Sequence, residues 1–290
     1  MLSYRHAYHA GNHADVLKHL VLMLTLEHFN SKDKPYLALD THAGAGIYSL
    51  HADAAQRTSE YQNGIARIWL RDDLPPALAS LRHLIRQANR SEKLMHYPGS
   101  PWIIRTLTRT TDRLRFCELH PTDHALLKRE FGETSNVTLE KEDGFLILKA
   151  ALPPVSRRGL VLMDPSYEIK SDYGKVVAAV KDALERFATG TFLVWYPLLP
   201  LTEAHILPER LRKAGASHWL DASLCVRAPA TDGHGMHGSG MFVVNPPWQL
   251  AAALNECLPY LAKHLATDDR ATWNLESYEQ PASKPATSRK

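Results

Sequence analysis

The sequence GLVLMDPSY (residues 159–167) joins a short apolar run to an acid, a proline and an aromatic residue. The apolar run predicts a buried strand, with Asp164 at its carboxyl end and a proline-stiffened turn directly after it. An acid, the Pro165 carbonyl and the Tyr167 ring, in this order, can hold a flat base by its exocyclic amine and by its face. Taken alone, these four residues are also typical of an ordinary strand-to-loop turn.

Such a turn suits the transfer of a methyl group to an exocyclic amine. The lone pair of an adenine N6 is delocalised into the ring, so acceptors must bind its hydrogens and concentrate electron density on the nitrogen. We therefore interpret Asp164 as the catalytic acceptor. Pro165 and Tyr167 are predicted to bind the substrate base, the first by its carbonyl and the second by stacking.

A second apolar run, residues 34–39, leads into DTHAGAG, an acid followed by two glycines. Glycines in a strand-to-helix turn let backbone N–H groups approach a ligand closely. The dinucleotide fingerprint needs a third glycine where this chain has Ser49, which disfavours an NAD-linked oxidoreductase. The pattern from Asp40 to Gly46 instead suits S-adenosylmethionine, which has an ammonium group and no pyrophosphate. A purely structural turn is the alternative.

Two further predicted strands end beside acids. Glu118 closes residues 113–118, where an acid of the second strand is expected to bind ribose hydroxyls. Asp143 and Gly144 follow residues 137–140 and are expected near the adenine of the cofactor. Each acid alone is typical of a solvated loop, but acids at the ends of successive strands predict one cofactor site.

The amino-terminal stretch MLSYRHAYHAGNHADVLKH is rich in polar, aromatic and basic residues and lacks the apolar core of a secretory signal. His9 and His13 have the spacing of metal ligands on a helix, but no matching glutamate or cysteine pair accompanies them, so no metal site is predicted. An apolar pattern predicts a helix from about Ala14. Lys18 and His19 would then lie at its edge, beside the cofactor or the substrate.

Six motifs follow one another along the chain: the amino-terminal stretch quoted above, DTHAGAG (40–46), YPGSP (97–101), LPPVSRRG (152–159), DPSYE (164–168) and GMFVVNPPW (240–248). Together and in this order, they resemble the RlmJ family of bacterial 23S ribosomal RNA adenine-N6 methyltransferases. The resemblance runs from Met1 to about Leu261. It implies an α/β, Rossmann-like, S-adenosylmethionine-dependent methyltransferase that has a mainly parallel sheet and a small helical insertion, and that methylates N6 of one adenine in 23S ribosomal RNA.

The resemblance also implies residue roles. Asp164 is the catalytic acceptor, and Tyr4, His6 and Lys18 lie near the substrate base. One departure is Ser166, which stands where the family usually has a second proline; the turn is then expected to be more flexible, with activity retained. The residues implied around the cofactor are His19, His42, Ser100, Glu118, Asp143, Gly144 and Asp164.

Length and composition agree with this picture. The 290 residues suit a methyltransferase domain over residues 1–266, with a helical insertion at about 50–111, followed by a polar tail over 267–290 that is expected to be disordered. Three scattered cysteines favour a reducing cytoplasm over a disulfide framework or a zinc site. No apolar run approaches membrane-spanning length. We expect a cytoplasmic monomer whose partner is 23S ribosomal RNA, with no membrane or metal partner.

A formal net charge of +3 is only mildly basic, so RNA contact requires local clustering. Helical spacing places Arg82, Arg86 and Arg90 along one stripe of the insertion. This stripe is either a phosphate-binding ridge or an ordinary solvated helix face.

Asn245-Pro246-Pro247-Trp248 is a second sequence of the catalytic type, because Asn-Pro-Pro-aromatic turns also occur in amino methyltransferases. It follows a late strand, whereas the catalytic turn is expected at the fourth strand, so we interpret it as a structural or substrate-side loop. Two further functions stay open. A DNA adenine methyltransferase is disfavoured because no sizeable target-recognition domain is evident, and a non-catalytic RNA-binding module is disfavoured because the cofactor-site acids are present.

Overall fold

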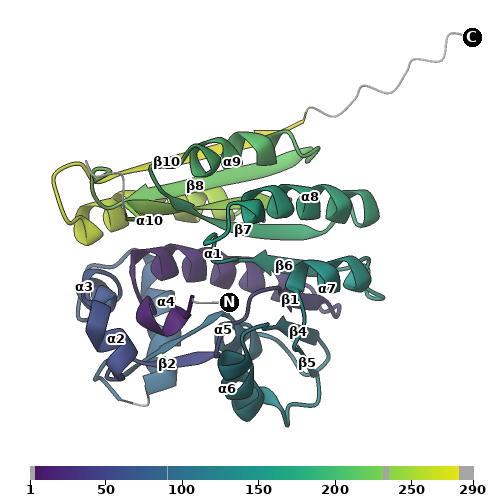
Figure 1. The fold of residues 1–290 in the computed structure, drawn as a ribbon, viewed down its shortest axis with the longest axis horizontal. Coiled ribbons are helices and arrows are strands. Elements are labelled where there is room, and N and C mark those ends of the chain that lie inside the picture. The colour runs from purple at the N-terminus through teal and green to yellow at the C-terminus, as the bar shows by residue number, and fades with distance from the viewer. Residues whose placement is uncertain (1–3, 90, 231–234, 281–290) are drawn as a thin grey trace, which may run out of the picture.

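The computed structural model describes residues 4–89, 91–230 and 235–280. Its centre is an eight-stranded sheet in the order β10-β8-β9-β7-β6-β1-β4-β5 (Figure 1). The neighbours from β5 to β7 are parallel, whereas β9 is antiparallel to both β7 and β8, and β10 is antiparallel to β8. The strands are β1 (Leu37–Asp40), β4 (Arg113–Cys117), β5 (Val137–Glu140), β6 (Gly159–Met163), β7 (Thr191–Leu198), β8 (His218–Cys225), β9 (Gly238–Val244) and β10 (Thr272–Glu279).

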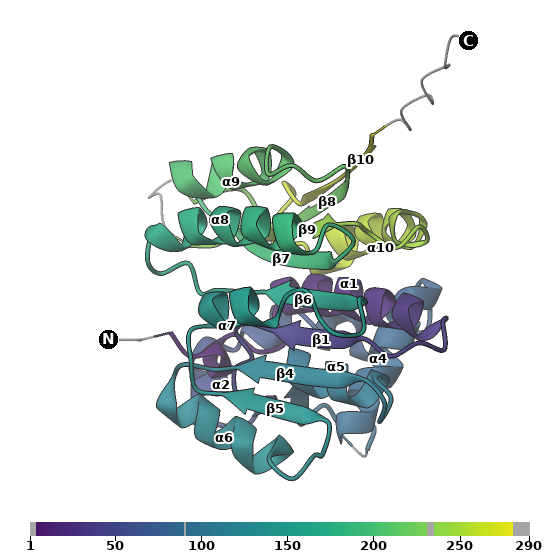
Figure 2. The same ribbon diagram turned by 90° about the vertical axis from the view of Figure 1, so that its right-hand side faces the viewer.

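Helices cover both faces of this sheet, and two separate apolar clusters lie between the layers (Figures 1 and 2). One cluster holds the buried side chains of α1 (His13–Asn30), α5 (Ser100–Leu107), α6 (Pro121–Phe131) and α10 (Leu250–Leu265). The other holds those of α7 (Gly144–Ala151), α8 (Ser171–Arg186) and α9 (Thr202–Arg212). Strands that alternate with crossover helices bury both faces of a parallel sheet in this way. The predicted Rossmann-like α/β class is confirmed.

Helix α1 is buried on nearly all sides, so the expected apolar stripe extends around most of the helix. It begins at Asn12, whose side chain accepts a hydrogen bond from the Asp15 N–H and caps the first turn. A helix enclosed by a sheet and by other helices can carry polar residues only where they have partners. Asp15, Lys18 and His19 are such residues, and each is less than a tenth exposed.

The chain between β1 and β4 contains the insertion. It consists of β2 (Ile47–Ser49), α2 (Asp53–Thr58), η2 (Glu60–Asn63), α3 (Ala66–Trp69), α4 (Pro76–Asn89) and β3 (His96–Pro98), followed by α5. The arginine stripe of α4 is not a free ridge. Arg82 donates to the Arg71 carbonyl, whereas Arg86 pairs with Glu92 at 3.1 Å and lies over the Trp69 ring. Arg90 lies outside the described residues.

Strand β10 corrects the prediction of a disordered tail over residues 267–290. Residues 272–279 pair with the whole length of β8, and Tyr278 stacks on Trp219 with ring centroids 5.9 Å apart. An edge strand is held by backbone hydrogen bonds, which a polar sequence supplies as well as an apolar one. Composition alone therefore misled the prediction. Residues 281–290 lie outside the described part of the chain.

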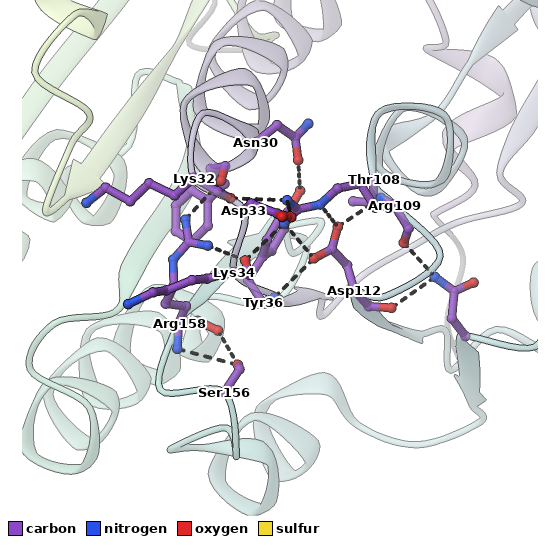
Figure 3. A network of polar contacts seen from close by, with 12 residues as sticks. Asn30, Lys32, Asp33, Lys34, Tyr36, Thr108, Arg109, Asp112, Ser156 and Arg158 are labelled. Atoms are coloured by element: carbon purple, nitrogen blue, oxygen red, sulfur yellow. Dashed lines mark hydrogen bonds and ion pairs between the residues drawn. The ribbon is translucent and has the colours of Figure 1, made fainter.

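The amino-terminal edge of the sheet is closed by polar contacts (Figure 3). Asp112 accepts from the Tyr36 N–H, while Arg109 and Arg158 both donate to the Lys34 carbonyl. Asn245 lies at the same edge, because β9 runs antiparallel to β7, and its side chain donates to the Ala188 and Gly190 carbonyls before β7. This edge is opposite to the one that carries Asp164, so the structural interpretation of Asn245 is confirmed.

Candidate active site

A cavity of about 280 Å³ lies at the carboxyl ends of β1, β4, β5 and β6. Parallel strands bring their carboxyl ends to one edge, which is where α/β proteins bind ligands. Acids that the sequence separates by up to 124 residues, Asp40 to Asp164, thus end near one edge. All of the residues predicted around the cofactor line this cavity: His19, His42, Ser100, Glu118, Asp143, Gly144 and Asp164.

Glu118 joins two sides of the cavity. Its Oε2 accepts from the Gly44 N–H at 2.8 Å and its Oε1 accepts from the His120 N–H at 2.6 Å. Burial raises the pKa of Glu118, and these two N–H groups oppose the rise. Gly44 has a φ of +63°, a backbone conformation that favours glycine. The glycine-rich turn is therefore fixed by the left-handed backbone of Gly44 and by its hydrogen bond to Glu118 of the neighbouring strand.

Asp40 plays a different part from the one its position suggested. It is fully buried and does not line the cavity, and its Oδ1 accepts from the His42 N–H at 3.1 Å. Burial raises its pKa to about 7. Asp40 therefore supports the glycine-rich turn through the His42 N–H.

Asp143 and Gly144 form the start of α7. The Asp143 side chain caps the helix by accepting from the Phe145 N–H at 2.9 Å. A Cβ on Gly144 would lie 2.0 Å from the Thr41 carbonyl oxygen, so only glycine allows α7 to approach the end of β1 this closely. The small residue predicted here is thus required by packing.

His19 is a buried, neutral imidazole in the wall of the cavity. Its Nδ1 lies 2.9 Å from the Tyr97 hydroxyl, whereas its Nε2 has no hydrogen-bond partner among the residues described. Burial lowers the pKa of His19 to about 3. Buried polar atoms are rarely left unpaired, so Nε2 is an atom that a bound ligand can satisfy.

A second cavity, of about 610 Å³, adjoins the first. Its further walls come from the amino-terminal stretch, from the end of β7 at Trp195, Pro197 and Leu199, and from Arg227 after β8. The sequence interpretation missed these wall residues, because nothing local to them marks a site. The residues that line both cavities are Tyr4, His6, Lys18, Asp164 and Ser166.

A continuous chain of polar contacts reaches from the amino-terminal stretch to Asp164. The Tyr4 hydroxyl lies 2.9 Å from His6 Nδ1, and His6 Nε2 lies 2.9 Å from Asp15 Oδ2. Lys18 Nζ contacts Asp15 Oδ1 at 2.8 Å and Asp164 Oδ2 at 2.5 Å. Burial opposes the charge on Lys18, but the two carboxylates outweigh burial and raise its pKa above the ordinary value. Asp15 is a member that the sequence interpretation missed, although an acid three residues before Lys18 on a helix was a usable signal.

The catalytic turn differs from the prediction at Tyr167. Its φ is +54°, and its ring is buried with its centroid 4.6 Å from that of Tyr173. The Tyr167 hydroxyl donates to the Trp195 carbonyl at 2.7 Å. Tyr167 lines neither cavity, so the prediction of Tyr167 as the stacking surface is wrong. Pro165 lines the first cavity as expected.

The described residues also bear on two other kinds of site. They contain no group of three or more histidine, cysteine, aspartate or glutamate side chains arranged to hold a metal ion. Across the same residues, no helix combines the length and the apolar character needed to cross a membrane.

The chain is similar to proteins of one family over most of its length. A family model described as "Ribosomal RNA large subunit methyltransferase D, RlmJ" matches residues 33–277. A protein named Ribosomal RNA large subunit methyltransferase J, from Escherichia coli (strain K12), is 51% identical over 265 residues, which cover 91% of this chain and 94% of that relative. A relative of the same name from Haemophilus influenzae is 46% identical over 277 residues, covering 95% and 98%.

A solved structure agrees with these matches. The crystal structure of a Legionella pneumophila protein superposes with a TM-score of 0.86 at 34% identity, covering 93% of this chain and 98% of that one. The chain therefore belongs to the RlmJ family of large-subunit ribosomal RNA methyltransferases.

Proposed function

We propose that this protein transfers a methyl group from S-adenosylmethionine to N6 of an extruded adenine in 23S ribosomal RNA. One observation carries the proposal: Asp164, at the end of β6, lines both cavities at once. A transferase needs its donor and acceptor to meet at one catalytic group. We assign the first cavity to the cofactor and the second to the base.

The donor set of the first cavity fits S-adenosylmethionine. We assign Glu118 to the ribose hydroxyls and Asp143 to the adenine end, with the unpaired Nε2 of His19 available to a polar group of the ligand. Gly44 and Gly144 line this cavity, and their missing side chains let Tyr48 and Thr41 pack closely beside them. When bound, the cofactor supplies an electrophilic methyl group.

Asp164 is the acceptor for the N6 hydrogens. Lys18 already binds Oδ2, so we assign Oδ1 to the amine of the base. A carboxylate that accepts from N6–H concentrates electron density on the nitrogen and can take up the proton that N6 must lose. The Lys18 ammonium contacts Asp164 Oδ2 at 2.5 Å and orients the carboxylate for this role.

The second cavity suits a nucleobase and its backbone. Trp195, Pro197 and Leu199 supply apolar walls, and Arg227 supplies a positive charge for phosphate. Tyr4 and His6 reach the same space from the amino-terminal stretch. The relatives are named for ribosomal RNA, which favours RNA over DNA as the substrate. We expect the protein to act as a cytoplasmic monomer on this RNA.

Analysis of the methylated nucleosides tests the proposal. Purified protein and S-adenosylmethionine are incubated with unmodified large-subunit RNA, with assembled subunits lacking the modification, and with duplex DNA, and each product is digested to nucleosides for mass spectrometry. We expect N6-methyladenosine from an RNA substrate and no N6-methyldeoxyadenosine from DNA. Methylation of DNA, or of another atom of RNA, would replace the proposal with a different methyltransferase.

A further inference from the structure

Asp15 lies at the junction between the amino-terminal stretch and the catalytic turn. It is buried to 1% exposure in the first turn of α1. Its Oδ2 accepts from the Gly11 N–H at 2.8 Å and contacts His6 Nε2 at 2.9 Å, and its Oδ1 contacts Lys18 Nζ at 2.8 Å. One carboxylate oxygen of Asp15 thus binds the amino-terminal stretch, and the other binds Lys18.

The surroundings of Asp15 keep it charged. Burial alone would raise its pKa, but the nearby His6 and Lys18 outweigh burial and hold the pKa of Asp15 well below its usual value. Lys18 therefore lies between two carboxylates, Asp15 and Asp164. The partition of its ammonium between them decides how strongly Asp164 is neutralised.

We propose that Asp15 is a positioning residue that couples the amino-terminal stretch to Asp164 through Lys18. The inference rests on the proposed function and deepens it, since Asp15 lines the second cavity and reaches Asp164 through Lys18. When Asp15 is charged and in contact with His6, it shares the Lys18 ammonium with Asp164, so Lys18 neutralises Asp164 less and Oδ1 of Asp164 stays free to accept from N6–H. If RNA displaced the amino-terminal stretch, the sharing of Lys18 between Asp15 and Asp164 would change, because His6 contacts the same carboxylate of Asp15.

The first test is a double-mutant cycle between Asp15 and Lys18. Asp15→Asn keeps the shape of the side chain and removes its charge. We expect it to lower the single-turnover methylation rate about tenfold or more in the parental chain, as loss of a contact to a charged group does, and by no more than about twofold in a Lys18→Met background. S-adenosylmethionine affinity, measured by calorimetry, stays within about twofold, because Asp15 does not line the cofactor cavity.

Glu60→Gln is the matched control. Glu60 also fastens the amino-terminal stretch, through His9 at 2.9 Å and Asn12 at 2.9 Å, but these contacts do not include Lys18. Its effect on the rate should therefore be the same with and without Lys18→Met. If Asp15→Asn behaves like this control, with one factor in both backgrounds, Asp15 merely holds the fold and the inference is overturned.

A second cycle avoids any change at Asp15, in case Asp15→Asn unfolds the protein. His6→Gln and Lys18→Met remove groups that contact different oxygens of Asp15. We expect their effects on the rate to be non-additive by about threefold or more, because the coupling passes through Asp15. Additive effects would overturn the inference. If the parental chain forms no N6-methyladenosine at all, the proposed function fails and the inference falls with it.

Discussion

Replacing Glu118 by alanine is the most informative perturbation of the cofactor cavity. Its carboxylate accepts backbone hydrogen bonds from Gly44 and His120, and we assign its remaining acceptor capacity to the ribose hydroxyls. The substitution removes the proposed ribose contact and also loosens the glycine-rich turn. Both effects weaken binding, so S-adenosylmethionine affinity should fall.

The magnitude follows from the kind of contact that is lost. Hydrogen bonds to a charged group contribute about 1.5–3 kcal/mol, which corresponds to about a 10- to 150-fold increase in the dissociation constant. Glu118→Gln should fall between the alanine variant and the parent, because the amide keeps one acceptor oxygen. Thermal unfolding without ligand separates weaker binding from damage to the fold. Any loss of stability there comes from the unpaired Gly44 and His120 N–H groups and not from the cofactor.

Isothermal titration calorimetry measures this change directly. The matched control is Glu140→Ala, at the end of the neighbouring β5; Glu140 pairs with Arg115 at 2.6 Å and does not line the cavity. Its affinity for S-adenosylmethionine should be parental within about twofold. An unchanged affinity in Glu118→Ala would refute the assignment of Glu118 to the cofactor.

Three further outcomes are expected. Asp164→Asn should abolish methylation while the fold persists, and Asn245→Ala should retain most of the methylation rate. Single-turnover kinetics measures the rates, and thermal unfolding shows whether each variant is folded. Equal loss of rate in two folded variants would count against Asp164 as the acceptor. Burial lowers the pKa of His19 from about 6.5 to about 3, so below about pH 6.5 the unfolded chain binds a proton at His19 and the folded chain does not. The stability of the folded chain that depends on a neutral His19 is therefore full above about pH 6.5 and is lost as pH falls. Between about pH 7.5 and 5.5, urea unfolding should show the parent losing about 1.4 kcal/mol more than His19→Gln, and equal losses would contradict this. Tyr167→Phe removes the hydrogen bond to the Trp195 carbonyl and should lower unfolding free energy by about 1 kcal/mol. It should leave the methylation rate within about twofold, and a large rate loss would restore Tyr167 to the site.

The parallel half of the sheet and the acids at its edge were predictable from the sequence. Alternating strands and helices force successive strands to be parallel, so the carboxyl ends that carry Glu118, Asp143 and Asp164 converge without knowledge of any distant contact. A strand ending in an acid is a local signal.

Other features depend on contacts that no local pattern records. The left-handed backbone at Tyr167 turns its ring into the core, and its partners, Tyr173 and Trp195, come from other elements. The link from Asp15 to the catalytic turn depends on the contact of Lys18 with Asp164, which joins α1 to the end of β6. Strand β10 forms because β8 offers a free edge, which composition cannot predict.

The central claim is that Asp164 directs methylation to an adenine N6 of large-subunit RNA. The most direct measurement maps N6-methyladenine in ribosomal RNA from cells that lack this protein and carry either the parental chain or Asp164→Asn at matched expression. We predict that one adenine of 23S RNA loses its N6-methyl group without the protein, regains it with the parental chain and stays unmethylated with Asp164→Asn. An unchanged adenine methylation pattern in all of these cells would contradict the claim.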